Sequence, residues 1–198
     1  MNYWLMKNEP DDYSIDDLKR DKIEPWDGIR NYQVRNMIRD EMQKGDQAFF
    51  YHSNCDVPGI YGLMIINSDA YPDHTAFDKK AKYYDSKSKK DNPTWLMVDV
   101  KYKRKLKNVI SLTELKSYKE LSNMRVVQRG NRLSITKIDK KDWNFILKLE
   151  RWVKNISINK YKIEIIFFKT TSDTKNYQKK TFFDKNNKKK LVFSYLTK

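Results

Sequence analysis

Residues 25–36 read Pro-Trp-Asp-Gly-Ile-Arg-Asn-Tyr-Gln-Val-Arg-Asn and combine flat rings, Arg and Asn side chains and a turn-forming Asp27-Gly28 pair. Trp26 and Tyr32 offer stacking surfaces, while Arg and Asn make paired hydrogen bonds to planar groups, so the mixture suits a base-sized ligand. A buried Trp beneath a capped helix explains the same residue types equally well. Both interpretations stay open from residue types alone.

The second half of this stretch has a helical period. Val34, Met37, Ile38 and Met42 recur at i, i+3, i+4 and i+8, which predicts one apolar helix face. The loop before it and the first helical turn then carry the aromatic and polar side chains. Free backbone N–H groups at a helix start favour polar or anionic partners, so a ligand is expected there.

The charge is lopsided. The chain has 198 residues and a net charge of +15. Residues 151–198 hold 13 Lys and Arg against 3 Asp and Glu, whereas residues 1–150 hold 28 against 23. A basic balance attracts polyanions, most commonly nucleic acid, although a Lys-rich coding bias yields part of it without function.

Cysteine usage and hydropathy indicate the compartment. Cys55 is the single cysteine, so no internal disulfide forms and a reducing compartment is expected. No apolar run is long enough to span a bilayer, and the first residues enter a strand-like pattern without a signal peptide. A soluble, cytoplasmic protein without membrane association is therefore predicted.

Propensity and capping signals predict an α+β domain over residues 1–150. Strands are expected at 3–7, 47–53, 59–66, 94–106 and 133–138, with helices after the Ser14 and Ser111 capping boxes, from residue 34 and at 140–150. Residues 69–93 predict a long ordered loop, and 121–127 a small helical turn before Gly130, which is expected at positive φ. No βαβ alternation occurs, so the sheet is predicted to be a small barrel of about six mostly antiparallel strands.

Residues 151–198 differ in composition from the rest. Ile-rich runs such as 163–168 alternate with Lys and Asn, and aromatic residues interleave with Lys, as in single-strand binders. These aromatic residues include Phe167, Phe168, Phe182, Phe183, Phe193 and Tyr195. AT-rich coding bias produces the same residues, so we expect a basic extension whose strands are marginal or poorly ordered.

Catalytic signals are sparse. His52 and His74 are the only histidines, and His52, Ser53 and Cys55 sit on a strand end, where neighbours face opposite ways and do not form a triad. No second His/Cys pair completes a metal tetrahedron, and neither GxGxxG nor a P-loop is present. The sequence predicts no catalytic residue, no metal and no cofactor.

A binding pocket has more support, because four separate segments combine rings with amides or hydroxyls. They are Trp26 with Tyr32, the strand end Tyr51, Ser53 and Asn54, Trp95, and the turn from Arg129 to Arg132. Trp4 and Trp143 follow strand and helix periods and are assigned to the core.

These segments, in order, carry a family resemblance. The matching pieces are 3–10 (Tyr-Trp-Leu-Met-Lys-Asn-Glu-Pro), 13–18, 26–36, 45–46, 50–54, 58–62, 70–73, 91–95 and 130–134. Together they resemble the EVE-domain family over residues 1 to about 150. The resemblance implies a PUA-like pseudo-barrel, related to the YTH readers of methylated adenine, that binds modified bases in DNA or RNA without established catalysis.

The resemblance also implies base-holding residues, which are Trp26, Asn31, Tyr32, Ser53, Asn54 and Trp95, and backbone contacts from Arg30, Arg129 and Arg132. Asn36, Tyr51, Asn131 and Ser134 are added because they lie in the same segments. The candidate ligand-binding residues are Trp26, Arg30, Asn31, Tyr32, Asn36, Tyr51, Ser53, Asn54, Trp95, Arg129, Asn131, Arg132 and Ser134. Residues 151–198 fall outside the resemblance. Asn8 replaces the Ser of the family's Lys-Ser-Glu-Pro motif and keeps a small polar residue there.

The leading hypothesis is a non-catalytic reader that holds one extruded modified nucleobase between aromatic walls and contacts phosphate through Arg and Lys. An enzyme acting on a base or nucleotide, with His52 or Glu9 as acid/base, is the second hypothesis. A small-metabolite sensor is the third. The identity of the base, DNA or RNA as the polymer, the pathway and the oligomeric state all stay open.

Overall fold

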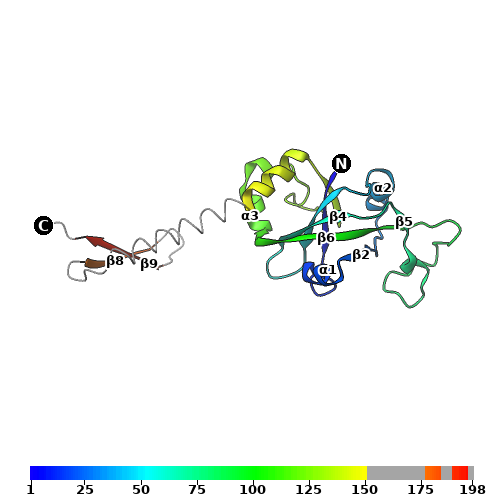
Figure 1. Cartoon of the computed structure of the whole chain (residues 1–198), viewed down its shortest axis with the longest axis horizontal. Helices are drawn as coiled ribbons and strands as arrows, with labels where there is room; N and C mark the ends of the chain where they lie inside the picture. The colour runs from blue at the N-terminus through cyan, green and yellow to red at the C-terminus, as the bar shows by residue number, and fades with distance from the viewer. Residues whose placement is uncertain (151–176, 184–188, 196–198) are drawn as a thin grey trace. The chain divides into compact units, whose positions relative to one another are not determined.

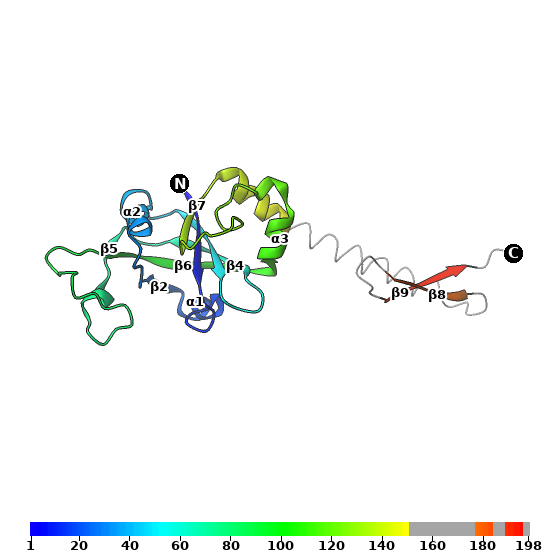
Figure 2. The same cartoon turned by 180° about the vertical axis from the view of Figure 1, so that it is seen from behind.

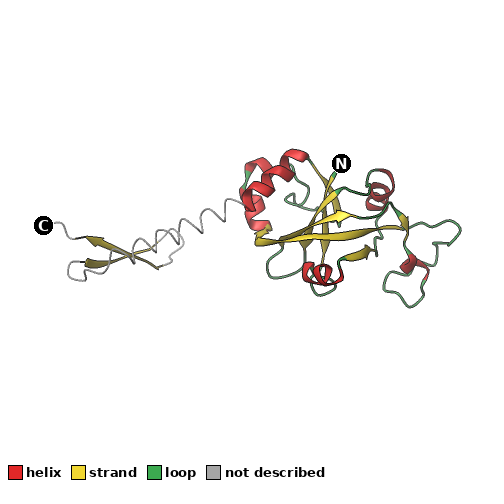
Figure 3. Cartoon of the chain, in the orientation of Figure 1, coloured by secondary structure: helices red, strands yellow, loops and turns green. Residues whose placement is uncertain are grey.

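The computed structural model describes residues 1–150, 177–183 and 189–195, and the chain divides into two compact units, Met1–Trp152 and Val153–Lys198. The strands of the first unit are β1 (Tyr3–Asn8), β2 (Ile23–Trp26), β3 (Gln47–His52), β4 (Gly59–Ile66), β5 (Tyr71–Pro72), β6 (Leu96–Ser111) and β7 (Ile135–Ile138). Its helices are α1 (Ile15–Asp21), α2 (Tyr32–Asp40), the 3-10 turn η1 (His74–Phe77), α3 (Leu112–Ser117), the 3-10 turn η2 (Lys119–Leu121) and the helical residues 140–150 (Figure 3).

One sheet organises this unit. Its strand order is β2-β6-β4-β3-β1-β7, and β5 pairs with one end of β6. Every pairing is antiparallel except that of β1 with β3. Both views place α3 and residues 140–150 at one end of β6, and β5 with the long loop that follows it at the other (Figures 1 and 2). The predicted α+β class with mostly antiparallel strands is confirmed.

The sheet is buried on both faces. Along β1, Tyr3 and Leu5 enter one core cluster with Trp143, whereas Trp4 and Met6 enter another with residues of α1 and α2. This alternation follows the period of two in a strand. Trp4 and Trp143 are fully buried, as predicted, and the indole N–H of Trp4 donates to the buried carboxylate of Asp46 at 3.0 Å.

Several boundaries differ from those that the sequence predicted. Trp26 ends a strand instead of lying in a loop, because β2 pairs antiparallel with β6 and sets Trp26 opposite Val98. The β6 strand continues to Ser111 instead of ending at residue 106, and α2 begins at Tyr32, two residues before the predicted start. The Ser14 capping box and the positive φ of Gly130 are confirmed.

The second unit is described only through β8 (Tyr177–Phe183) and β9 (Lys189–Tyr195), which pair antiparallel. The Ile-rich run at 163–168 and the expected poor order of the extension lie outside the described residues. Across the part of the chain that the structure describes, no helix has the length and apolarity needed to cross a membrane.

Two contacts hold the start of α1 against the sheet. Gly62 of β4 lies directly beneath Ile15, since a Cβ on Gly62 would approach Ile15 Cδ1 to 2.5 Å. Buried His52 at the end of β3 accepts the backbone N–H of Ile15 through Nε2 at 3.2 Å and stacks on Tyr61 at 3.9 Å between ring centres. Because a protonated imidazole no longer accepts, this contact requires neutral His52.

Burial lowers the pKa of His52 to about 4 from its usual 6.5. The unfolded chain therefore binds the extra proton first, so stability falls as pH decreases from about 6.5 toward 4. We expect the free energy of unfolding to drop by about 1 kcal/mol between pH 7.5 and 5.5, above the range in which carboxylates titrate.

Denaturant titrations at the two pH values test this expectation. His52→Gln retains an acceptor for Ile15 but does not titrate, and should lose most of the decrease. Identical pH dependence in the wild type and His52→Gln would show that His52 is not responsible.

Candidate nucleobase-binding cleft

A cleft of about 360 Å³ opens where β1 and β2 end. Its walls come from four parts of the chain: the end of β1 and the turn after it, the end of β2 and the loop to α2, the long loop after β5, and the residue before β7. The lining residues are Lys7, Asn8, Asp12, Tyr13, Glu24, Pro25, Trp26, Asp27, Gly28, Ile29, Arg30, Lys82, Tyr83 and Ser134. Its size is that of a small-ligand pocket.

Trp26 is a rigid part of this wall. Only 7% of the residue is exposed, and its ring meets Phe50 edge to face at 5.4 Å between centres. Phe50 is itself fully buried in β3. Because Phe50 packs against it, the Trp26 ring presents a fixed surface, and less entropy is lost when a ligand stacks on it.

Asp73 connects the loop after β2 to the long loop after β5. Its side chain is fully buried and accepts from the Gly28 N–H at 3.0 Å, from Arg30 Nη1 at 2.7 Å and from both the N–H and the hydroxyl of Thr75. Burial opposes ionisation, but hydrogen bonds from Arg30 and Thr75 outweigh it and lower the pKa of Asp73. The ionised carboxylate thereby aligns both loops.

Arg30 extends the same network across the long loop. Its guanidinium donates to the Tyr83 carbonyl and to the Thr75 hydroxyl, and it lies 5.7 Å from the Tyr83 ring centre and 5.5 Å from that of Trp95. Arg30 was predicted to contact phosphate. In the structure its donors bind the protein itself, and this arrangement sets Tyr83 over Gly28.

The cleft holds polar groups that are poorly solvated. Burial lowers the pKa of the Lys7 ammonium, which lies 5.9 Å from the Tyr51 ring centre and has no carboxylate within ion-pair distance among the described residues. Burial raises the pKa of the half-buried Glu24. Desolvation of its carboxylate and then the negative charge of Asp73 raise the pKa of Asp27, although the residue as a whole is exposed. Desolvated donors and acceptors in one cleft are typical of a binding site.

Asn31 and Tyr32 follow Arg30 in the chain but do not line the cleft. The Asn31 side chain accepts from the Val34 N–H at 3.1 Å and caps α2. Tyr32 is 61% exposed, and its ring centre lies 4.9 Å from that of Trp95. Trp95 is buried and donates to Asp85 at 2.6 Å. The structure therefore brings Tyr32 and Trp95 together, outside the cleft that contains Trp26.

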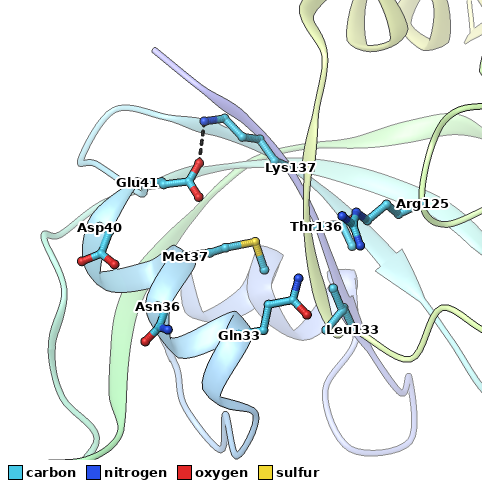
Figure 4. Close-up of a pocket in the computed structure, with 9 residues that line it drawn as sticks. All are labelled: Gln33, Asn36, Met37, Asp40, Glu41, Arg125, Leu133, Thr136 and Lys137. Atoms are coloured by element: carbon cyan, nitrogen blue, oxygen red, sulfur yellow. Dashed lines mark hydrogen bonds and ion pairs between the residues drawn. The ribbon is translucent and has the colours of Figure 1, made fainter.

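Asn36 lies in a different groove, of about 580 Å³, between α2 and β7. Figure 4 shows Gln33 and Met37 extending from α2 toward Leu133 and Thr136, with the Lys137–Glu41 ion pair across one side. This groove contains no aromatic ring. It therefore lacks a stacking surface for a base.

The predicted residues at the end of β3 do not line the cleft. Tyr51 is buried in the core, on the opposite face of the sheet from Trp26. The backbone N–H of Ser53 donates to the Asn8 carbonyl at 2.9 Å, and Asn54 donates to Glu9 at 3.1 Å. Ser53 thus holds the backbone of Asn8, which lines the cleft.

Of the predicted residues in the turn before β7, Ser134 lines the cleft and the other three do not. Ser134 lines the cleft, and its carbonyl accepts from the Lys7 N–H at 2.8 Å. Asn131 accepts from the Leu133 N–H, whereas Arg129 and Arg132 are exposed and absent from the cleft lining. Of the thirteen candidates, Trp26, Arg30 and Ser134 therefore meet at one cleft.

Sequence reasoning missed the cleft residues Lys7, Tyr13 and Tyr83, and also Asp73, which binds the cleft residues Gly28 and Arg30. Lys7 ends a buried strand, and Asp73 and Tyr83 lie in the long loop, whose length already indicated a role in a site. The sequence signal that could have identified Lys7 was a lysine near the end of an otherwise buried strand.

His52, the acid/base residue of the second hypothesis, lies outside the cleft. The His52 Nε2 is occupied by the Ile15 N–H, and the residue is absent from the cleft lining. Within the described residues, no group of three or more His, Cys, Asp or Glu is placed to hold a metal ion. The cleft offers stacking and hydrogen bonding instead.

The EVE domain model matches residues 2–149, so the chain belongs to the EVE domain family. Human thymocyte nuclear protein 1 is 47% identical over 168 residues, covering 75% of this chain and 74% of the relative. Its crystal structure in complex with DNA containing 5-methylcytosine has a TM-score of 0.72, with 47% identity, over 76% of this chain and 98% of that chain. The crystal structure of a Pseudomonas syringae protein has a TM-score of 0.73 and 44% identity, over 75% of this chain and 99% of that chain.

One relative also matches the region beyond the domain. The uncharacterized protein C21.03c of Schizosaccharomyces pombe is 36% identical over 210 residues, covering 98% of this chain and 86% of its own length. The similarity to this fungal protein therefore continues past residue 150, into the basic extension.

Gly28 offers a test of the packing between the two loops. Its φ is +73°, and a Cβ there would lie 2.6 Å from the Tyr83 ring, whereas Gly130 has φ +82° and open space around it. Gly28→Ala should cost about 1–3 kcal/mol more than Gly130→Ala, because both carry backbone strain but only the first displaces a ring. Urea unfolding measures both, and equal losses would contradict the proposed packing.

Proposed function

We propose that this protein binds nucleic acid carrying a modified base, and holds that base, extruded from its stack, in the Trp26 cleft. The observation that carries the proposal is the combination of a fixed indole wall with the half-buried Glu24 carboxylate and the half-buried Lys7 ammonium, which has no ion-pair partner among the described residues. A nucleobase has a flat face for the ring and acceptor and donor atoms along its edge. Both match the cleft.

The relative bound to 5-methylcytosine DNA supports this choice of ligand. In the proposed complex the Lys7 side chain turns from the Tyr51 ring and donates to an acceptor on the base edge, and the Glu24 carboxylate accepts from the exocyclic amine of the base. A methyl group adds apolar area to be buried against the rings, contributing about 0.8 kcal/mol, or about fourfold in affinity. One stacked base provides roughly 1–3 kcal/mol, so phosphate contacts supply the rest and binding is expected to be micromolar and salt-sensitive.

The test is a binding screen of the full chain against short single- and double-stranded DNA and RNA. Each oligonucleotide carries one 5-methylcytosine, 5-hydroxymethylcytosine or N6-methyladenine, or no modification. Fluorescence anisotropy should detect preference for one modified base by about fourfold or more. Equal affinity for all strands would refute base recognition.

Lys7→Met tests the cleft directly. The variant should remain folded, because it replaces a desolvated ammonium by an apolar side chain of similar length, yet lose about tenfold in affinity for the preferred strand. Lys137→Met in the other groove is the matched control and should keep the preference. If Lys7→Met bound normally and Lys137→Met did not, the ligand would belong to the groove between α2 and β7.

A further inference from the structure

The mouth of the cleft is bridged by an ion pair between two loops. Lys82, in the loop after β5, sets its Nζ 3.0 Å from Asp12 Oδ2 in the turn after β1. Both residues line the cleft, beside Tyr83 and Tyr13 respectively. The side chains are 66% and 50% exposed, so solvent screens the pair and it contributes little to stability.

Lys82 belongs to a basic stretch. Residues 79–90 contain six lysines and one acid, Asp85, whose carboxylate already accepts from the Trp95 indole and the Lys87 N–H. All six lysines are exposed. Of these six, only Lys82 has an ion-pair partner among the described residues. The long loop therefore presents positive charge beside the cleft.

The other two cations of the cleft are not free to bind a phosphate at its mouth. The Arg30 guanidinium is committed to Asp73, Thr75 and the Tyr83 carbonyl, so moving it would separate the loops that form the wall. The Lys7 ammonium is half-buried. Lys82 alone combines a place on the cleft lining with a largely exposed side chain and an easily separated partner.

We infer that Lys82 binds the phosphodiester next to the base held in the cleft, and that Asp12 is its internal competitor in the free protein. The inference rests on the proposed function, because the base places the phosphate at the mouth. When nucleic acid binds, the ammonium exchanges a carboxylate for a phosphate oxygen. Asp12 is then left facing a polyanion, so it opposes binding twice, by holding Lys82 and by repelling the backbone.

This competition has a distinctive consequence: removing an acid should strengthen binding. Asp12→Asn should tighten affinity for the preferred oligonucleotide by about two- to fivefold, the range expected from a freed exposed pair. Asp11→Asn is the matched control, because Asp11 is the exposed neighbouring acid and has no ion-pair partner among the described residues. It should change affinity less.

Lys82→Gln should weaken binding and reduce the slope of log affinity against log salt by about 0.7–0.9, which corresponds to one lost phosphate contact. Lys79→Gln, in the same loop but absent from the cleft lining, should affect the slope less. In the Lys82→Gln background, Asp12→Asn should lose most of its effect. Anisotropy titrations at several salt concentrations compare the wild type with all five variants, including the double variant.

The inference is overturned if Asp12→Asn binds no more tightly than the wild type, if Asp11→Asn gains equally, or if the Asp12→Asn gain persists without Lys82. Failure of base recognition is a separate result. It would make the affinities for modified and unmodified strands equal but leave the slopes of log affinity against log salt unchanged. Conversely, an intact ratio with no Lys82 dependence would refute only the phosphate contact. Absence of any nucleic-acid binding would refute both.

Discussion

The buried carboxylate of Asp73 is the interaction on which the functional end of this domain depends. It accepts from the Gly28 N–H and from Arg30 on one loop, and from Thr75 on another. Breaking a buried charge pair by removing one partner costs about 3–5 kcal/mol, so neither loop moves independently of the other. Trp26 and Tyr83, which face the same cleft, owe their relative positions to this carboxylate.

The sheet supplies the rigid part of the site and the loops supply its chemistry. Lys7 lies near the end of β1, which is packed on both faces, and Trp26 at the end of β2 is buried in one core cluster, so the core fixes both backbones. Glu24 and Asp27 contribute acceptors, and the long loop contributes Tyr83 and positive charge. Such a division, in which a scaffold positions variable loops, is usual for binding sites.

Local patterns were enough to predict the α+β class, most strands and helices, and the importance of Trp26. Short-range signals failed at β2, because its four residues include Pro25, which is tolerated here since β2 forms an edge of the sheet. Asp73 and Tyr83 were missed because their partner Arg30 lies 43 and 53 residues away. Tyr51 and Trp26 were grouped by residue type, but the sheet separates them onto opposite faces.

The most direct measurement is a crystal structure of the protein with an oligonucleotide carrying the modified base that it prefers. The proposed function predicts that base out of its stack, with its face against Trp26, its edge within hydrogen-bond distance of Lys7 Nζ, and the adjacent phosphate near Lys82. A base that remained stacked in the nucleic acid, or that entered the groove between α2 and β7, would contradict it.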